Sequence, residues 1–214
     1  EKYAVTLRMD VTREELIAAI DETFSDATDK DISLFYINCH GDYDGSAYIE
    51  LHDGTRVTAA QLELLLRRIP GKVVVIMDCC RSGGFLSDAG RFMGAVQSAF
   101  SRPNGPLTDG KYIVLTSAGP DQDSYRRSFA EGDGEESMAT IMARALCEGA
   151  GWDLIGNRIC TLKADADKNR QITLQEMYLY LSRRVMYYLE GTGVEQTVCV
   201  WPEGDQTVLF GRAG

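Results

Sequence analysis

A histidine and a cysteine that could act together follow two mostly apolar stretches of the chain. His40 follows residues 34–39, and Cys80 follows residues 73–79. Each stretch has the length of a β-strand, is rich in β-branched or aromatic residues, and is followed by glycine within a few positions. A thiol with an imidazole beside it can become a thiolate and attack a carbonyl carbon. The pattern therefore predicts a Cys–His pair for nucleophilic catalysis, provided that the two strands are neighbours.

The strands that would hold this pair belong to a series in which strands and helices alternate. Strands are expected over 3–7, 33–39, 72–78, 112–117 and 197–201, with a hairpin over 48–57. Such alternation is typical of an α/β protein whose mainly parallel sheet carries helices on both faces. Parallel strands end at one edge of the sheet, where open α/β sheets place their active sites.

Helices are predicted where a threonine is followed three residues later by glutamate or glutamine. This capping box occurs at Thr12, Thr58 and Thr173, and apolar residues at helical spacing follow each of them. Two further helices are expected over 87–100 and from residue 138 onward, from the spacing of their apolar residues.

The composition is that of a soluble globular protein. The chain has 214 residues, of which 44% are hydrophobic and 25% charged, and its net charge is −10. We expect a single domain over 1–214. The negative charge argues against a nucleic-acid partner, which clustered Lys and Arg would bind. No apolar run reaches the ~18 residues of a membrane span.

The residues around the Cys–His pair resemble a known family. His40-Gly41 follows one strand, and the motif D-C-C-R-S-G at 78–83 follows the next main strand. This order is similar to that of the caspase-like cysteine peptidases, in which the histidine lies about 50 residues before the nucleophile. Asp78 makes the chain more similar to metacaspases and to bacterial clostripain-like and legumain-like enzymes. The resemblance implies a caspase-like three-layer α/β/α sandwich and a cysteine endopeptidase.

The resemblance also assigns roles to the two adjacent cysteines. Cys80 takes the place of the nucleophile and Cys79 a variable place, in agreement with the rule that neighbouring strand residues point to opposite sides. Cys80 would form an acyl-enzyme intermediate, and His40 would move the proton. The N–H groups of Gly41 and Cys80 would bind the oxyanion. The residues leave open a buried structural His with an inert Cys, and a metal site that includes Cys39.

Asp78 is the candidate for selecting the peptide that is cut. It lies two residues before Cys80 on the same side of the strand, and the resemblance implies a pocket for Arg or Lys of a peptide or protein substrate. A guanidinium would supply the charge and hydrogen bonds that a buried carboxylate needs. Ser117 and Asp121 are further candidates for substrate binding. The alternatives are a carboxylate that local N–H groups satisfy, and an ordinary polar turn after the third strand.

A polar segment at 165–176 resembles in part the 12-residue calcium loop of EF-hands. Its candidate ligands carry side-chain oxygens and are Asp165, Asp167, Asn169, Gln171 and Glu176. Glycine is expected at the sixth position, but Arg170 stands there. The Cys–His chemistry needs no cofactor, so Ca²⁺ is a candidate for this loop alone. The alternative is a turn before the capping box at Thr173.

A long polar segment at 119–137 is predicted to be a flexible loop. It contains the dibasic pair Arg126-Arg127, in the region where caspase-like enzymes are often processed. Self-cleavage at this pair is therefore a hypothesis. The alternative is two solvated charges beside an acidic run.

The resemblance also implies a first central strand before the element at 3–7, and nothing in the chain matches it. Either the chain is a processed piece, or an additional N-terminal segment completes the sheet. Two rival functions stay open, a catalytically silent caspase-like interaction module and a calcium-binding structural domain. The sequence does not decide whether this soluble, bacterial-type protein is secreted or cytoplasmic.

Overall fold

A computed structural model describes residues 3–84, 110–129 and 137–211 of the chain. The helix expected over 87–100 and residues 130–136 of the expected loop lie outside these described ranges. Among the described residues, no helix has both the length and the apolar character needed to cross a membrane.

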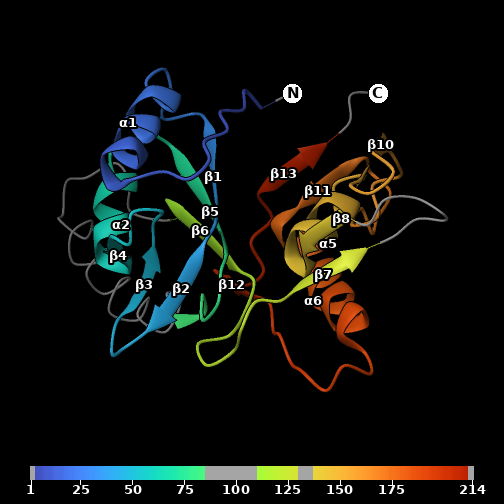
Figure 1. Cartoon of the computed structure of the whole chain (residues 1–214). Coiled ribbons are helices and arrows are strands. Elements are labelled where there is room, and N and C mark those ends of the chain that lie inside the picture. The colour runs from blue at the N-terminus through green and yellow to red at the C-terminus, as the bar shows by residue number, and fades with distance from the viewer. Residues whose placement is uncertain (1–2, 85–109, 130–136, 212–214) are drawn as a thin grey trace.

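The centre of the molecule is a four-stranded sheet in the order β1-β5-β6-β12 (Figure 1). Strands β1 (Ile32–Asn38), β5 (Lys72–Asp78) and β6 (Tyr112–Thr116) run parallel, and β12 (Cys199–Trp201) pairs with β6 antiparallel. Branched apolar residues dominate β5 because both faces of a central strand are buried. The α/β class and the mainly parallel sheet are confirmed, with one antiparallel strand at an edge.

Helices cover both faces of this sheet, as the alternation of elements predicts. α1 (Arg13–Thr23) and α2 (Ala59–Leu66) lie on one face, and α5 (Ile141–Gly149) and α6 (Leu174–Leu189) lie on the other (Figure 1). Alternate residues of β5 enter the two cores, one set among the side chains of α1 and α2 and the other among those of α5 and α6. The carboxyl ends of the central strands are thereby held between two packed layers.

The predicted starts of three helices are confirmed. Thr12, Thr58 and Thr173 each accept a hydrogen bond from the N–H three residues further on, and the Glu or Gln at that position bonds back to the threonine N–H. Helix α5 begins later than its apolar spacing predicts, because Thr140 caps it and Met138 belongs to a strand.

Short antiparallel strands flank the central sheet. One three-stranded sheet holds β2 (His40–Tyr43), β3 (Ala47–Glu50) and β4 (Arg56–Thr58), which confirms the hairpin predicted over 48–57. The other strands form pairs, β7 (Arg126–Phe129) with β8 (Ser137–Thr140), β9 (Trp152–Asp153) with β10 (Arg158–Ile159), and β11 (Gln171–Thr173) with β13 (Val208–Gly211).

The strand predicted over 3–7 is wrong, since this segment forms no strand. Its alternating apolar side chains are exposed, Val5 at 83% and Leu7 at 74%. The physical reason is the absence of a partner. Strand β1 lies at the end of the sheet and pairs with β5 alone among the described strands, and the 3–7 segment does not reach its free edge. An isolated extended segment has no ladder of hydrogen bonds to hold it.

The prediction of a flexible loop over 119–137 is also wrong for the part that the structure describes. Arg126 and Phe129 bound strand β7, which pairs with β8 through four residue pairs. Gln122 and Tyr125 are held by hydrogen bonds to distant segments. Polar composition alone could not reveal these partners, because they lie about 70 residues away in sequence.

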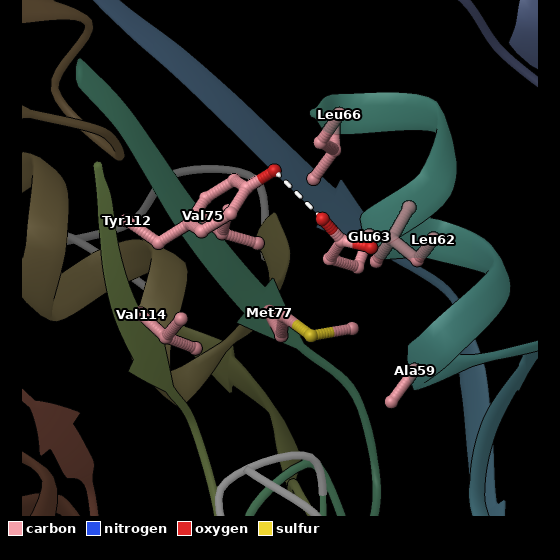
Figure 2. A pocket seen from close by; sticks show the side chains of 8 residues that line it. All are labelled: Ala59, Leu62, Glu63, Leu66, Val75, Met77, Tyr112 and Val114. Atoms are coloured by element: carbon pink, nitrogen blue, oxygen red, sulfur yellow. Dashed lines mark hydrogen bonds between the residues drawn. The ribbon is translucent and has the colours of Figure 1, made fainter. Parts of the chain in front are cut away.

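A small cavity lies between α2 and the sheet (Figure 2). Its volume of about 20 Å³ suffices for one water molecule. The carboxylate of Glu63 faces this cavity from α2, and the hydroxyl of Tyr112 donates to it across 3.5 Å. Arg67 neutralises the same carboxylate, with 2.6 Å between Nη2 and Oε2. This cavity is too small for a peptide side chain, so the substrate site must be sought at the strand ends.

Candidate active site

The carboxyl ends of β1 and β5 lie next to each other, as the sequence predicts. The two strands are parallel, and their last paired residues are Asn38 and Asp78. His40 and Cys80 each lie two residues beyond this last pair. His40 does not end the first strand, however. Strand β1 ends at Asn38, Cys39 lies between the two strands, and His40 begins β2.

Gly41 brings the segments of the candidate His and Cys into direct contact. A Cβ atom at this residue would lie 2.6 Å from the carbonyl oxygen of Cys80, closer than real Cβ atoms approach backbone oxygen. Only glycine leaves room for the backbones to approach in this way. The glycine that follows His40 is therefore required by space, because the backbones of Gly41 and Cys80 lie in contact.

The thiol of Cys80 is half-buried and faces the chain segment after β6. Its Sγ lies 3.8 Å from the carbonyl oxygen of Ser124, while the imidazole of His40 is exposed and makes no hydrogen bond to the thiol. Catalytic hydrogen bonds are often long without substrate and tighten when it binds. The arrangement thus has the order of groups that the sequence predicts, with the imidazole exposed and the thiol half-buried.

A strained residue follows the nucleophile directly. Arg81 has a φ of +53°, a left-handed conformation that costs energy for a residue with a side chain. Its N–H donates to the carbonyl oxygen of Gln122 across 2.8 Å, and its guanidinium pairs with Asp42 beyond His40. These contacts hold the sharp turn after Cys80, and with it the direction of the Cys80 N–H.

Asp78 is buried among hydroxyl groups. Asp78 is 1% exposed. Its carboxylate accepts hydrogen bonds from the hydroxyls of Tyr36 at 2.8 Å, of Ser124 at 3.0 Å and of Thr140. Burial, and after it the negative charge of Asp78, raises the pKa of Tyr36, so this phenol stays a donor. No Lys or Arg of the described chain forms an ion pair with Asp78. The alternative of local backbone N–H partners is wrong, because the partners are side chains from three other segments.

The structure separates the two other candidates for substrate binding. Ser117 is fully buried, and its Oγ donates to the carbonyl oxygen of Cys79 across 3.2 Å and lies 3.4 Å from the hydroxyl of Ser82. It supports the strand end that carries the nucleophile. Asp121 is exposed in the turn after Pro120. Ser117 thus lies in the core next to the residue that follows β5, and Asp121 lies in an exposed turn.

Two glutamines that the sequence analysis did not single out hold the loop over the nucleophile. Gln196 is buried, donates from Nε2 to the carbonyl oxygen of Ser117 at 2.9 Å, and accepts from the N–H of Tyr125 at 3.0 Å. Gln122 accepts from the N–H of Thr197 at 2.7 Å. Their contacts are long-range in sequence, and no local motif marks these residues.

The calcium-like segment folds as a closed loop. Ligand atoms of Asp165, Asp167 and Glu176 all lie within 4.8 Å of one another. Arg170 has a φ of +68°, so it adopts the left-handed turn for which glycine was expected, and its N–H donates to Asp165. Asn169 also donates its N–H to Asp165.

The remaining residues of this loop serve the local structure as well. The N–H of Gln171 donates to the side chain of Asn169 at 2.7 Å, and Gln171 begins β11. Glu176 bonds to Thr173 in the capping box of α6 and also accepts from the N–H of Ala166 at 3.0 Å. The capping box and the acidic loop are therefore both present, and neither excludes the other.

The dibasic pair lies in a paired strand. Arg126 and Arg127 are exposed in β7, opposite Thr140 and Ala139 of β8. Arg126 donates to the side-chain oxygen of Asn38 at 3.1 Å, beside the catalytic strand end. Arg127 donates to the carbonyl oxygen at the end of α6. Arg126 thus joins β7 to the end of β1, and Arg127 joins β7 to α6.

Comparisons with known proteins agree with this geometry. The family model described as "Caspase domain" matches residues 1–203. The crystal structure of caspase-1 from Spodoptera frugiperda has a similar fold. The match covers 97% of this chain and 74% of that chain, with a TM-score of 0.61 and 14% sequence identity.

A second solved structure, protein GSU0716 from Geobacter sulfurreducens, is similar over 92% of this chain and 79% of its own, with a TM-score of 0.49 and 16% identity. The comparison with curated proteins found no match. The family match extends over nearly the whole chain, from the N-terminal segment past β12, and includes both strand ends described above. This chain belongs to the caspase-domain family.

Proposed function

We propose that this protein is a cysteine endopeptidase that cleaves peptide bonds after Arg or Lys. The observation that carries the proposal is the approach of Gly41 to the carbonyl of Cys80, which joins the histidine and cysteine segments at neighbouring strand ends. The alternative of a buried structural His with an inert Cys is disfavoured, because His40 is exposed and Cys80 is only half-buried. A metal site is disfavoured, because no metal-binding cluster in the described ranges includes Cys39, His40, Cys79 or Cys80.

The proposed reaction has two stages. The thiol of Cys80 gives its proton to His40, and the thiolate attacks the carbonyl carbon of the scissile bond. The N–H groups of Gly41 and Cys80 bind the oxyanion that forms. His40 then protonates the leaving amine, which departs and leaves an acyl-enzyme. Water activated by His40 hydrolyses the thioester and restores both side chains.

The preference for a basic residue is supported by the environment of Asp78. Three hydroxyl groups surround its carboxylate, and no ion pair joins it to a cation in the described ranges. Hydroxyl donors satisfy oxygen lone pairs but leave a net negative charge in a buried place. A guanidinium or ammonium that displaces one of the hydroxyls would neutralise that charge.

Reporter peptides that differ only in the residue before the scissile bond test this specificity. We expect kcat/KM for Arg or Lys to exceed that for Asp or Ala by about 10- to 100-fold, the value of a charge-assisted hydrogen bond. Faster turnover of the Asp peptide would overturn the basic preference while leaving the peptidase activity intact. An electrophilic Arg peptide that fails to label Cys80 would instead favour a silent interaction module.

We propose further that the loop at 165–176 binds Ca²⁺. Its support is the convergence of Asp165, Asp167 and Glu176 and the left-handed turn at Arg170. We expect millimolar Ca²⁺ to raise the melting temperature by about 5 °C relative to chelator, as binding to the folded state alone requires. Asp167→Ala should abolish this shift without disturbing the capping box. An equal shift in both proteins would contradict the site.

Self-processing at Arg126-Arg127 is a third proposal, and it needs local opening. The bond between these residues lies in a strand paired with β8, so β7 must leave its partner before a second molecule can cut it. Mass spectrometry of the intact wild type and of Cys80→Ala shows whether each chain is cleaved. Fragments that end at Arg126 or Arg127 in the wild type alone support the proposal, and identical fragments in both would rule it out.

An additional segment that pairs with the free edge of β1 is proposed as well. Its support is the edge of β1 with which no described strand pairs, together with the exposed apolar side chains of Val5 and Leu7. We expect amide hydrogens on the free edge of β1 to exchange fast in residues 1–214 alone and slowly with the segment attached. Equal exchange in both forms would remove this proposal.

A further inference from the structure

Two thiols lie next to each other one residue before the catalytic pair. The register of β1 and β5 ends at Asn38 with Asp78, so Cys39 and Cys79 are the next opposed residues. Both side chains border the core beside α1 and α2, and the neighbouring Cys39 thiol, followed by burial, raises the pKa of Cys79 well above its usual value. Cys79 is 2% exposed, whereas Cys39 is half-buried and open to reagents from solution.

The buried thiol of this pair also touches the backbone of the proposed oxyanion site. A Cβ atom at Gly41 would lie 3.1 Å from Sγ and 3.3 Å from Cβ of Cys79. The same position is 2.6 Å from the carbonyl oxygen of Cys80. Gly41 therefore lies beside both Cys79 and Cys80, so a movement of the Cys79 side chain changes the packing around it.

We propose that Cys39 and Cys79 form a reversible disulfide that displaces Gly41 and switches the peptidase off. Neighbouring strands are about 4.8 Å apart, which is within the Cα separations that disulfides span. The effect on activity rests on the proposed peptidase function. The formation of the bond does not depend on it.

The bond forms by exchange with a disulfide of low molecular weight. The thiolate of Cys39 attacks one sulfur of that reagent and releases one thiolate, giving a mixed disulfide. The sulfur of Cys79, after losing its proton, attacks the sulfur of Cys39 and releases the second thiolate. Two electrons pass from the protein thiols to the reagent, and the two protons go to the released thiolates.

The consequence for catalysis follows from the lengths involved. The two unbonded sulfurs must approach to about 2.05 Å in a disulfide. A displacement of about 1 Å at catalytic groups can cost about 100-fold in rate. Since Gly41 contacts Cys79 directly, we expect the oxidised protein to lose about 10- to 100-fold in kcat/KM and to recover with reductant.

Peptide mapping tests the bond without any assay of activity. Cleavage after Lys and Arg places Cys39 in the peptide 31–56, and Cys79 with Cys80 in the peptide 73–81. In Cys80→Ala each of these peptides holds one cysteine, so a cross-link between them identifies the Cys39–Cys79 bond. The protein is first oxidised in a buffer of oxidised dithiothreitol, and the remaining free thiols are then capped. We expect the cross-link in Cys80→Ala and not in Cys80→Ala/Cys39→Ala. The absence of the cross-link at the most oxidising ratio would overturn the proposal.

Activity in the same buffers tests the switch. The wild type should lose activity over the range in which the cross-link appears, and Cys39→Ala should keep it. Cys160→Ala is the matched control, a half-buried thiol far along the chain, and it should behave as the wild type does. A cross-linked wild type that stays fully active would overturn the switch. A reduced wild type that cleaves no reporter would refute the peptidase proposal, while the peptide map would still decide on the bond.

Discussion

Replacement of Cys80 by alanine is expected to lower kcat/KM on an Arg reporter by about 10⁴-fold, because the loss of a nucleophile leaves only binding and the oxyanion site. Cys79→Ala is expected to stay within about tenfold of the wild type, since it removes a few contacts from the core and no reacting atom. The two side chains differ in direction. Cys79 packs in the core beside α1 and α2, and Cys80 faces the carbonyl oxygen of Ser124.

Steady-state kinetics of the two variants and of the wild type measure this difference. Melting curves supply the control, since both variants should unfold within a few degrees of the wild type. A variant Cys79→Ala without activity, beside an active Cys80→Ala, would reverse the assignment of the nucleophile. If both variants lost activity with unchanged melting curves, both cysteines would take part in catalysis. That result would contradict the expectation that neighbouring strand residues point to opposite sides.

The second large effect is expected at Gly41. Gly41→Ala should lower kcat/KM by about 10²- to 10³-fold, the loss observed when one oxyanion donor is misplaced. A Cβ atom 2.6 Å from the carbonyl oxygen of Cys80 must push either backbone away, and a backbone atom cannot rotate aside as a long side chain can. The loss should appear mainly in kcat, because the oxyanion forms only during the reaction.

Gly45→Ala is the matched control for this change. Gly45 lies in the turn after β2, has a φ of +98° and has no neighbouring atom within 4 Å of the added Cβ. Its replacement should cost about 1 kcal/mol of stability through backbone strain, with little effect on kcat. Unchanged kinetics in Gly41→Ala would show that the close approach to Cys80 has no part in catalysis.

The amino-acid sequence by itself determined the elements that follow local rules. The strand that ends at Asp78 was predicted with its observed bounds, because a run of branched apolar residues between turns has few alternatives. The capping boxes at Thr12, Thr58 and Thr173 were predicted because both partners lie within one turn of helix. The order of the two apolar strands along the chain was enough to predict that their carboxyl ends, which precede His40 and Cys80, lie side by side.

The tertiary structure alone decided which groups complete the site. The hydroxyls that bind Asp78 come from Tyr36, Ser124 and Thr140, which lie 42, 46 and 62 residues away along the chain. Gln196 reaches Ser117 across 79 residues. Periodicity and capping patterns extend over a few residues, so they carry no information about such partners.

The failures of the sequence analysis have the same origin. Apolar and polar residues alternate over 3–7 as they do in a strand. A strand forms only where a neighbour supplies hydrogen bonds, and no described strand pairs with the segment 3–7 or with the free edge of β1. Arg126 and Arg127 were expected in a flexible loop, but pairing with Thr140 and Ala139 makes them part of a strand. Local patterns thus determined where the catalytic residues stand in the chain, and long-range packing decided what surrounds them, because burial and hydrogen bonding depend on which distant segments fold together.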